Sequence, residues 1–267
     1  MPFPESPKVT YDKAPLEEVI CQLRFNPILR IDTELPSTFQ DAIRAEYPLF
    51  EEIKGHEQEL PAEVRGQIPP EVLSLLRQAA ELKKYNFASS NKAWTVTLSR
   101  GFIALTTKDY STWRDFYGRF ERPLDTLIKL YSPIHFTRVG LRYQNVIRRS
   151  RLGLEGVSWS ELLSEHIAGI YAAPDFDRER IQGTRSVAEI QLNDDCGIVR
   201  LNYGTVQNSS SAEVGYLLDS DFFVENIGTG DKDHVITRLA QFNQKAARLF
   251  RWCISEQLHA AMGPTEH

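Results

Sequence analysis

The sequence predicts an α+β protein built from two pseudo-symmetric β-α-β-β-β-α halves, which share an antiparallel sheet backed by two long helices. Segments in which apolar and polar residues alternate, as in half-buried strands, recur along the 267 residues. These segments fall into two groups along the chain, and each group is followed by a long amphipathic pattern that is typical of a helix packed on a sheet. A short strand motif also occurs twice, as Leu23-Arg24-Phe25 and as Leu141-Arg142-Tyr143. We therefore expect an arm at 1–9, a first repeat at 10–131, a second repeat at 134–262 and a tail at 263–267.

The first half is expected to open with a strand and to close with a long helix. Trp, Val, Thr and Phe at a period of two predict the later strands, because these residues suit a pleated, half-buried surface. Pro36-Ser37 is a helix-start signal before aromatic and aliphatic residues at a spacing of four. The expected elements are a strand at 17–25, a helix at 36–50, a polar stretch at 53–70, a short helix at 71–84, strands at 85–89, 94–99 and 102–108, and a helix at 113–131.

The second half repeats this order. A strand that carries the second Leu-Arg-aromatic motif comes first, and a long helix with inward Val, Leu, Phe and Ala residues comes last. Its expected elements are a strand at 135–147, a short helix at 159–167, strands at 187–192, 198–203 and 214–224, and a helix at 231–262.

Two sequence matches indicate an internal duplication. The Leu-Arg-aromatic motifs begin the two halves, and FERPLDTLIKLY at 120–131 aligns with FNQKAARLFRWC at 242–253 at nearly the same offset. The alternative is that one α+β protein contains two similar amphipathic elements by chance.

Composition favours an ordinary globular protein, with 42% hydrophobic and 25% charged residues. A net charge of −5 argues against a protein whose whole surface coats nucleic acid. The N-terminus lacks the pattern of a secretory signal, and no stretch approaches the about 18 apolar residues of a membrane span. Cys21, Cys196 and Cys253 show no disulfide or metal spacing, so we expect three buried thiols in a reducing cytoplasm.

The strand period of two places Arg24 and Arg142 on the open face of the sheet, opposite the core. An arginine there could hold a phosphate or carboxylate through its guanidinium fork, with the two arginines as symmetric anchors. It could also form a structural ion pair with Asp219 or Asp221 across the strands. The predicted ligand-binding residues are Arg24, Arg142, Gln144, Arg200, Asp219 and Asp221.

Two other kinds of site compete with this prediction. A dense basic segment could attract a nucleic-acid backbone. Asp219 and Asp221, on one face of a strand, could hold a divalent cation for a metal-dependent hydrolase. The phosphate-binding glycine loops, the serine-hydrolase elbow and the zinc-protease motif are all missing from the sequence, so no catalytic residue and no cofactor is assigned. The residues of the basic segment are Arg138, Arg142, Arg148, Arg149 and Arg151.

Four segments carry a resemblance along nearly the whole chain: LEEVICQLRF, WTVTLSRGFIALTTKDYSTWRDF, FTRVGLRYQN and LFRWCISEQLHAAMGP. They resemble a sporadically distributed family of uncharacterised bacterial proteins of about this length. The resemblance implies a bacterial, intracellular protein and brings no catalytic residues. The expected topology is also similar to TATA-box-binding-protein-like folds, in which two related halves form a saddle whose open sheet face binds its ligand.

The sequence therefore predicts a non-enzymatic binding module that uses its polar sheet face or the cleft between its halves. Its expected partner is another protein or a small anionic ligand, without a membrane, and a homodimer is a further expectation. Nucleic-acid binding is the first alternative, and metal-dependent hydrolysis is the second.

Overall fold

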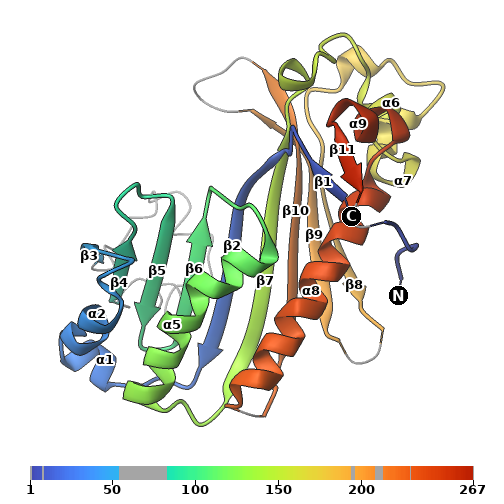
Figure 1. The fold of residues 1–267 in the computed structure, drawn as a ribbon. Coiled ribbons are helices and arrows are strands. Elements are labelled where there is room, and N and C mark those ends of the chain that lie inside the picture. Colours follow the sequence, from blue (N-terminus) through green and yellow to red (C-terminus); the bar gives the residue numbers. More distant parts are fainter. Residues whose placement is uncertain are drawn as a thin grey trace, which may run out of the picture. The chain divides into compact units, whose positions relative to one another are not determined.

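The computed structural model describes residues 2–7, 9–53, 83–193, 196–207, 213–228 and 230–266. It confirms a mixed α+β fold with a large antiparallel sheet. The chain divides into two compact units (Figure 1). The first unit is Gln22–Arg138 with Ile227–Gly230, and the second is Met1–Cys21, Val139–Asn226 and Asp231–His267. The short helix expected at 71–84, and most of the polar stretch before it, lie outside the described residues.

The first unit contains strands hydrogen-bonded in the order β3-β4-β5-β6-β2. The expected alternation is present: Trp94, Val96 and Leu98 are buried, whereas Thr95 and Thr97 are half-buried. On the face opposite the buried residues, polar side chains form hydrogen bonds with one another: the Thr97 hydroxyl donates to Asn86 Oδ1 at 2.8 Å. The strands are β2 (Leu16–Phe25, whose first part belongs to the second unit), β3 (Leu49–Ile53), β4 (Lys84–Ala88), β5 (Trp94–Ser99) and β6 (Phe102–Thr107).

Helix α5 (Trp113–Tyr131) lies along the sheet of the first unit (Figure 1), after the short helices α1 (Arg30–Thr33) and α2 (Ser37–Ile43). It begins where the Thr112 side chain accepts a hydrogen bond from the Asp115 N–H, which satisfies one of the open donors of the first turn. It ends at Ser132, which adopts a left-handed conformation. Its apolar stripe is buried, as the sequence period of three to four predicts: Phe116, Phe120, Leu124 and Leu127.

The second unit contains strands in the order β7-β10-β9-β8 and a separate pair, β1 with β11. Helix α8 lies along β10 and β9 (Figure 1), and Phe242 of α8 packs against Phe222 of β10 with ring centroids 6.1 Å apart. The strands are β1 (Val9–Tyr11), β7 (Phe136–Ile147), β8 (Arg185–Gln191), β9 (Ile198–Gln207), β10 (Val214–Glu225) and β11 (Pro264–Glu266). The helices are α6 (Trp159–Leu162), α7 (Glu165–Ala168), α8 (Lys232–Cys253) and α9 (Glu256–Ala261), with 3-10 helices η1 (Arg149–Leu152), η2 (Gly169–Ala172) and η3 (Arg178–Arg180).

Two expected helices are interrupted at the same contact. The helix predicted at 231–262 ends at Cys253, and the one predicted at 159–167 ends at Leu162. Leu163 and Ile254 are both extended and form an isolated antiparallel bridge, in which Ser164 N–H donates to Cys253 O at 3.0 Å. Both predictions were therefore wrong for one reason: each break satisfies the backbone groups of the other.

The helix predicted at 36–50 is also shorter than expected, because it ends at Ile43 and the chain enters β3 at Leu49. Pro48 prevents the helix from continuing to residue 50, since a proline disfavours a helical conformation in the residue before it. Val9 of the expected N-terminal arm pairs with Glu266 of the expected tail, and Tyr11, expected to lie in the first repeat, pairs with Pro264.

The order of strand pairing is the same in the two units. It runs β2-β6-β5-β4 in the first and β7-β10-β9-β8 in the second, and each series is followed by a long helix. Strand β3 extends the first series and has no counterpart in the second among the described residues. The internal duplication stays a prediction that this shared order supports.

Candidate functional site

The polar face of the second unit is built by strand register. Asp219 of β10 lies opposite Asn202 of β9, and Asn202 lies opposite Val187 of β8. The next row along the strands contains Asp221, Arg200 and Glu189 in the same order. Because side chains alternate between faces, these two rows lie on the side opposite the core residues Leu201, Leu218 and Phe222. We call this surface, together with Arg142 of β7, the polar face.

Arg142 and Asp219 form a two-point ion pair at the centre of the polar face. Arg142 Nε and one terminal nitrogen each donate to one oxygen of Asp219, both at 2.7 Å. Asn202 Nδ2 donates a third hydrogen bond to the same carboxylate at 3.2 Å. The Asp219 side chain is only 5% exposed, whereas that of Arg142 is 38% exposed. The hydrogen bond to Asp219 raises the pKa of Arg142 against the opposing effect of burial.

The second row of the polar face is more exposed and less strongly held. Arg200 Nε donates to Glu189 Oε1 at 2.8 Å, and the guanidinium lies 5.8 Å from the centre of the Phe223 ring. About half of each charged side chain is in solvent, so screening makes this pair worth little. Asp221 lies opposite Arg200 in the register, and Gln144 is half-buried two residues beyond Arg142 on β7.

Arg24 has a different environment from Arg142. It is exposed in the first unit, and its Nε donates to Gln22 Oε1 at 2.8 Å. Asp219 therefore pairs with Arg142, which is one of the two arrangements that the sequence left open, whereas Arg24 bonds to an amide and not to a carboxylate. The two arginines are not equivalent anchors in the structure.

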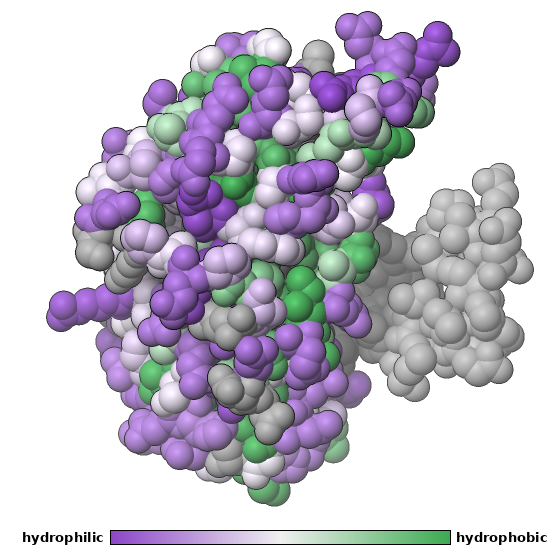
Figure 2. Space-filling view, turned by 90° about the vertical axis from the view of Figure 1, so that its right-hand side faces the viewer, coloured by the Kyte–Doolittle hydropathy of each residue, from purple (hydrophilic) through white to green (hydrophobic). Residues whose placement is uncertain are grey.

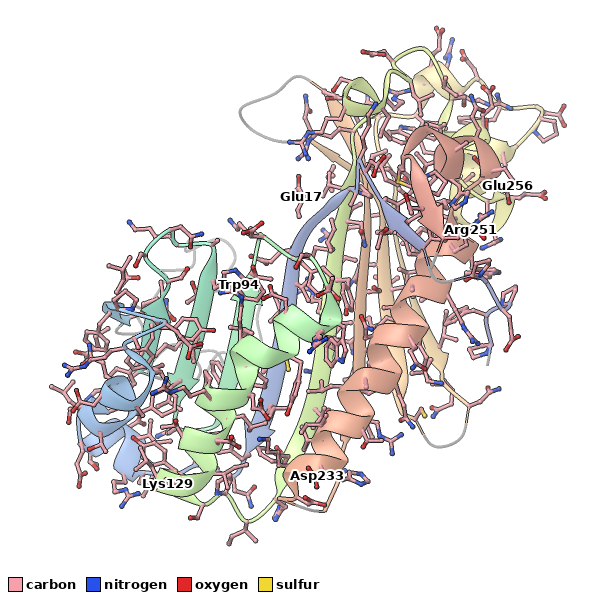
Figure 3. The ribbon with its side chains drawn as sticks, in the orientation of Figure 1. Glu17, Trp94, Lys129, Asp233, Arg251 and Glu256 are labelled. Atoms are coloured by element: carbon pink, nitrogen blue, oxygen red, sulfur yellow. The ribbon has the colours of Figure 1, made fainter. Side chains whose placement is uncertain are left out.

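The basic segment is occupied by internal contacts at several of its positions. Arg148 forms an ion pair with Glu17 of β2, which Figure 3 labels. Arg149 donates to Val157 O at 2.8 Å and stacks over Trp159 at 4.7 Å. With Arg142 bound to Asp219, a phosphate backbone would have to compete with the existing contacts of three arginines. Arg151 is exposed in η1, and Arg138 belongs to the first unit, where it also has an interaction.

Neither a metal centre nor a reactive thiol is found in the part of the chain that the structure describes. No group of three or more His, Cys, Asp or Glu residues there is placed to hold a metal ion. The guanidinium of Arg142 already neutralises the Asp219 carboxylate. All three cysteines are free and buried, as the sequence predicted, and burial raises the pKa of the Cys21 and Cys253 thiols.

A cavity of about 250 Å³ lies between β1, α8, α9 and β11, and the sequence patterns did not predict it. Tyr11 Oη lies 2.9 Å from His259 Nδ1 at its wall, and burial raises the pKa of Tyr11 to about 12. Arg251 and Glu256 form an ion pair beside it and lie close together in Figure 3. No local pattern could predict this cavity, because its walls come from opposite ends of the chain.

Strand β8 is the last strand in the order of the second unit, and among the described residues it pairs with β9 alone. Its side chains on the polar face are all exposed, and Val187 is 61% exposed although it is apolar and lies at mid-strand. Figure 2 shows the molecule from the right-hand side of Figure 1, the side on which β8 lies. The coloured residues on this side are a mixture of hydrophilic and hydrophobic ones. The four exposed side chains are Arg185, Val187, Glu189 and Gln191.

Comparisons with known proteins give no match: neither the family models nor the curated proteins searched are similar to this chain. Within the described ranges, no helix combines the length and the apolar character needed to cross a lipid bilayer.

Proposed function

We propose that this protein is a non-enzymatic protein-binding module that adds an extended segment of its partner to β8. The observation that carries the proposal is the position of β8 at the end of the strand order, with alternate side chains exposed. The outer side of such a strand presents backbone N–H and C=O groups that a second strand can pair with. Strand addition supplies affinity through these groups and specificity through the alternate side chains.

A protein partner fits the polar face better than a small anion does. The fork of Arg142, which an anion would need, already binds both oxygens of Asp219. An incoming anion that took this fork would leave the buried Asp219 carboxylate with the Asn202 amide alone. Leaving a buried charge without its partner costs several kcal/mol, on the order of 3 to 5. The Arg142–Asp219–Asn202 contact is therefore a fixed support behind β8.

The side chains of β8 define the chemistry of the partner segment. Opposite charges across neighbouring strands attract, and apolar β-branched residues pack well against one another. The preferred segment places an acidic residue beside Arg185, an apolar residue beside Val187 and a basic residue beside Glu189. Written from its N-terminus in antiparallel pairing, this pattern is basic-x-apolar-x-acidic.

The wider setting of the proposal is a bacterial cytoplasm and a duplicated chain. The buried free thiols suit a reducing compartment, and the resemblance of the four quoted segments supports a bacterial origin. The shared order of strand pairing supports the duplication. The internal contacts of the basic segment and the Arg142–Asp219 pair leave nucleic-acid binding and metal-dependent hydrolysis without a supporting observation.

A synthetic peptide tests strand addition directly. A fluorescent peptide with the basic-x-apolar-x-acidic pattern should raise its anisotropy with the wild-type protein. It should lose that binding with Val187→Lys, which places a charge at the centre of the contact. Ile134→Lys is the matched control, because Ile134 is 88% exposed and belongs to the first unit.

A second peptide separates backbone pairing from side-chain attraction. The same sequence with methylated backbone nitrogens keeps its charges but lacks N–H donors, so we expect it not to bind. Equal binding of the methylated peptide, or equal binding by the wild type and Val187→Lys, would refute strand addition at β8.

A further inference from the structure

We infer that a second copy of this chain supplies the strand that pairs with β8, which gives an antiparallel dimer centred on Val187. The inference rests on the proposed function, because it names the partner for the same strand. It follows from the sequence of β8, in which Val187 has Arg185 two residues before it and Glu189 two residues after it on the same face. Two-fold symmetry requires a strand that is complementary to its own reverse, and β8 meets this requirement.

In the antiparallel register centred on Val187, each exposed side chain near the two-fold axis faces a complementary side chain of the second copy. Val187 of one copy faces the partner's Val187, so two apolar side chains that are exposed in the monomer cover each other. Arg185 faces the partner's Glu189, and symmetry repeats this ion pair on the other side of the axis. On the opposite face Ser186 faces the partner's Ala188, and both side chains are small enough to avoid a clash.

Other registers lose this complementarity. An antiparallel pair centred on Ala188 places each Val187 against a glutamate and each Arg185 against a glutamine. A parallel pair in register places Arg185 against Arg185 and Glu189 against Glu189, and like charges directly opposite each other are unfavourable. Among these arrangements, only the antiparallel register centred on Val187 pairs both the charges and the apolar residue.

The dimer would extend the sheet and place both polar faces on the same side, because facing side chains in one sheet share a face. The contact is short, since β8 spans Arg185–Gln191. Small interfaces bind weakly, so we expect a dissociation constant on the order of micromolar, at the low end of protein–protein contacts. The dimer should therefore form and dissociate over an accessible range of protein concentration.

Sedimentation velocity of the full chain, from about 1 to 100 µM, measures this equilibrium at the expected affinity. The wild type should shift from monomer to dimer. Arg185→Glu alone and Glu189→Arg alone should each remain monomeric, because each creates two like-charge contacts in the homodimer. An equimolar mixture of the two variants should dimerise again, since every Glu then faces an Arg. Thermal melting of each variant shows that it is folded.

A disulfide test fixes the register. Facing residues in an antiparallel pair have Cα atoms about 4.5 to 5.5 Å apart, within the range that a disulfide spans. Val187→Cys should therefore form a covalent dimer on mild oxidation, and the native cysteines should not interfere because all three are buried. Gln191→Cys should not cross-link, since in this register it faces residue 183 of the second copy.

The outcomes distinguish the inference from the proposed function. A wild type that stays monomeric yet binds the synthetic peptide would overturn the self-pairing and leave strand addition intact. A wild type that neither dimerises nor binds the peptide would overturn both. A dimer that persists in Arg185→Glu, or cross-links equally well through Gln191→Cys, would place the interface elsewhere and also overturn the inference.

Discussion

Removing Arg142 should destabilise the protein more than removing the charge of Asp219. The two side chains share one ion pair but differ in exposure, at 38% for Arg142 and 5% for Asp219. Arg142→Met takes away two of the three hydrogen bonds to a buried carboxylate and leaves the Asn202 amide alone. Asp219→Asn leaves a guanidinium that water reaches, and the new amide still offers one acceptor oxygen.

The expected magnitudes follow from this asymmetry. Breaking a buried pair so that one charge is left without its partner costs about 3 to 5 kcal/mol. Because Arg142 is 38% exposed, Arg142→Met should lie at the low end of this range, at about 3 kcal/mol. Asp219→Asn should cost about 1 to 2 kcal/mol, the range for a lost charged hydrogen bond. The double variant Arg142→Met with Asp219→Asn should cost less than the sum of the two, because no charge is left buried.

Urea unfolding followed by tryptophan fluorescence measures these free energies, with the slope of the transition as a check on cooperativity. Arg24→Met is the matched control: it removes the arginine at the corresponding position of the first Leu-Arg-aromatic motif, which is exposed and bonds to Gln22. We expect the control to change stability by less than about 0.5 kcal/mol. An Asp219→Asn cost equal to or above that of Arg142→Met would refute the reasoning, because burial would then not decide the asymmetry.

Three further predictions concern the rest of the molecule. None of the cysteines should react with a thiol reagent until the protein unfolds, because all three are buried and burial raises the thiol pKa of two of them; a fast native reaction would contradict this. Thermal stability should fall as pH rises from about 10 to about 12, since Tyr11 ionises later in the folded state than in the unfolded chain, and Tyr11→Phe should reduce the fall. Ser255→Ala should cost about 1 kcal/mol in urea unfolding, because the Ser255 hydroxyl accepts from the Leu258 N–H at the start of α9; an unchanged midpoint would show that the cap is unimportant.

Local signals in the sequence predicted the longer strands and the two long helices, whereas the short strands β1, β3 and β11 were not predicted and the helix breaks depend on contacts distant in sequence. Alternation at a period of two placed β5, β6 and β7 within one or two residues of their ends. The break after Cys253 was not predictable, because it depends on a bridge between Leu163 and Ile254. No periodic pattern in one segment contains information about a partner about ninety positions away.

The candidate site shows the same limit. Strand period placed Arg142 and Asp219 on one face, but the sequence left both an ion pair and a ligand site open. The register of β10 on β9 adds Asn202 to the carboxylate and thereby decides for the ion pair. The self-complementary face of β8 can be read from the sequence once the strand is known to be last in its order.

The two arginines of the repeated motif explain why function is proposed for the second unit. Arg142 lies beside β10, which supplies a buried carboxylate, and the resulting contact holds the polar face behind β8. Strand β6 holds the corresponding place beside β2, and its sequence FIALTT contains no acidic residue. If the halves arose by duplication, the second unit alone among the described residues kept or gained the fixed support. Under the proposed function, a partner strand paired with β8 would meet a rigid, charge-patterned surface, and substitutions in β8 should affect association without a matching loss of stability.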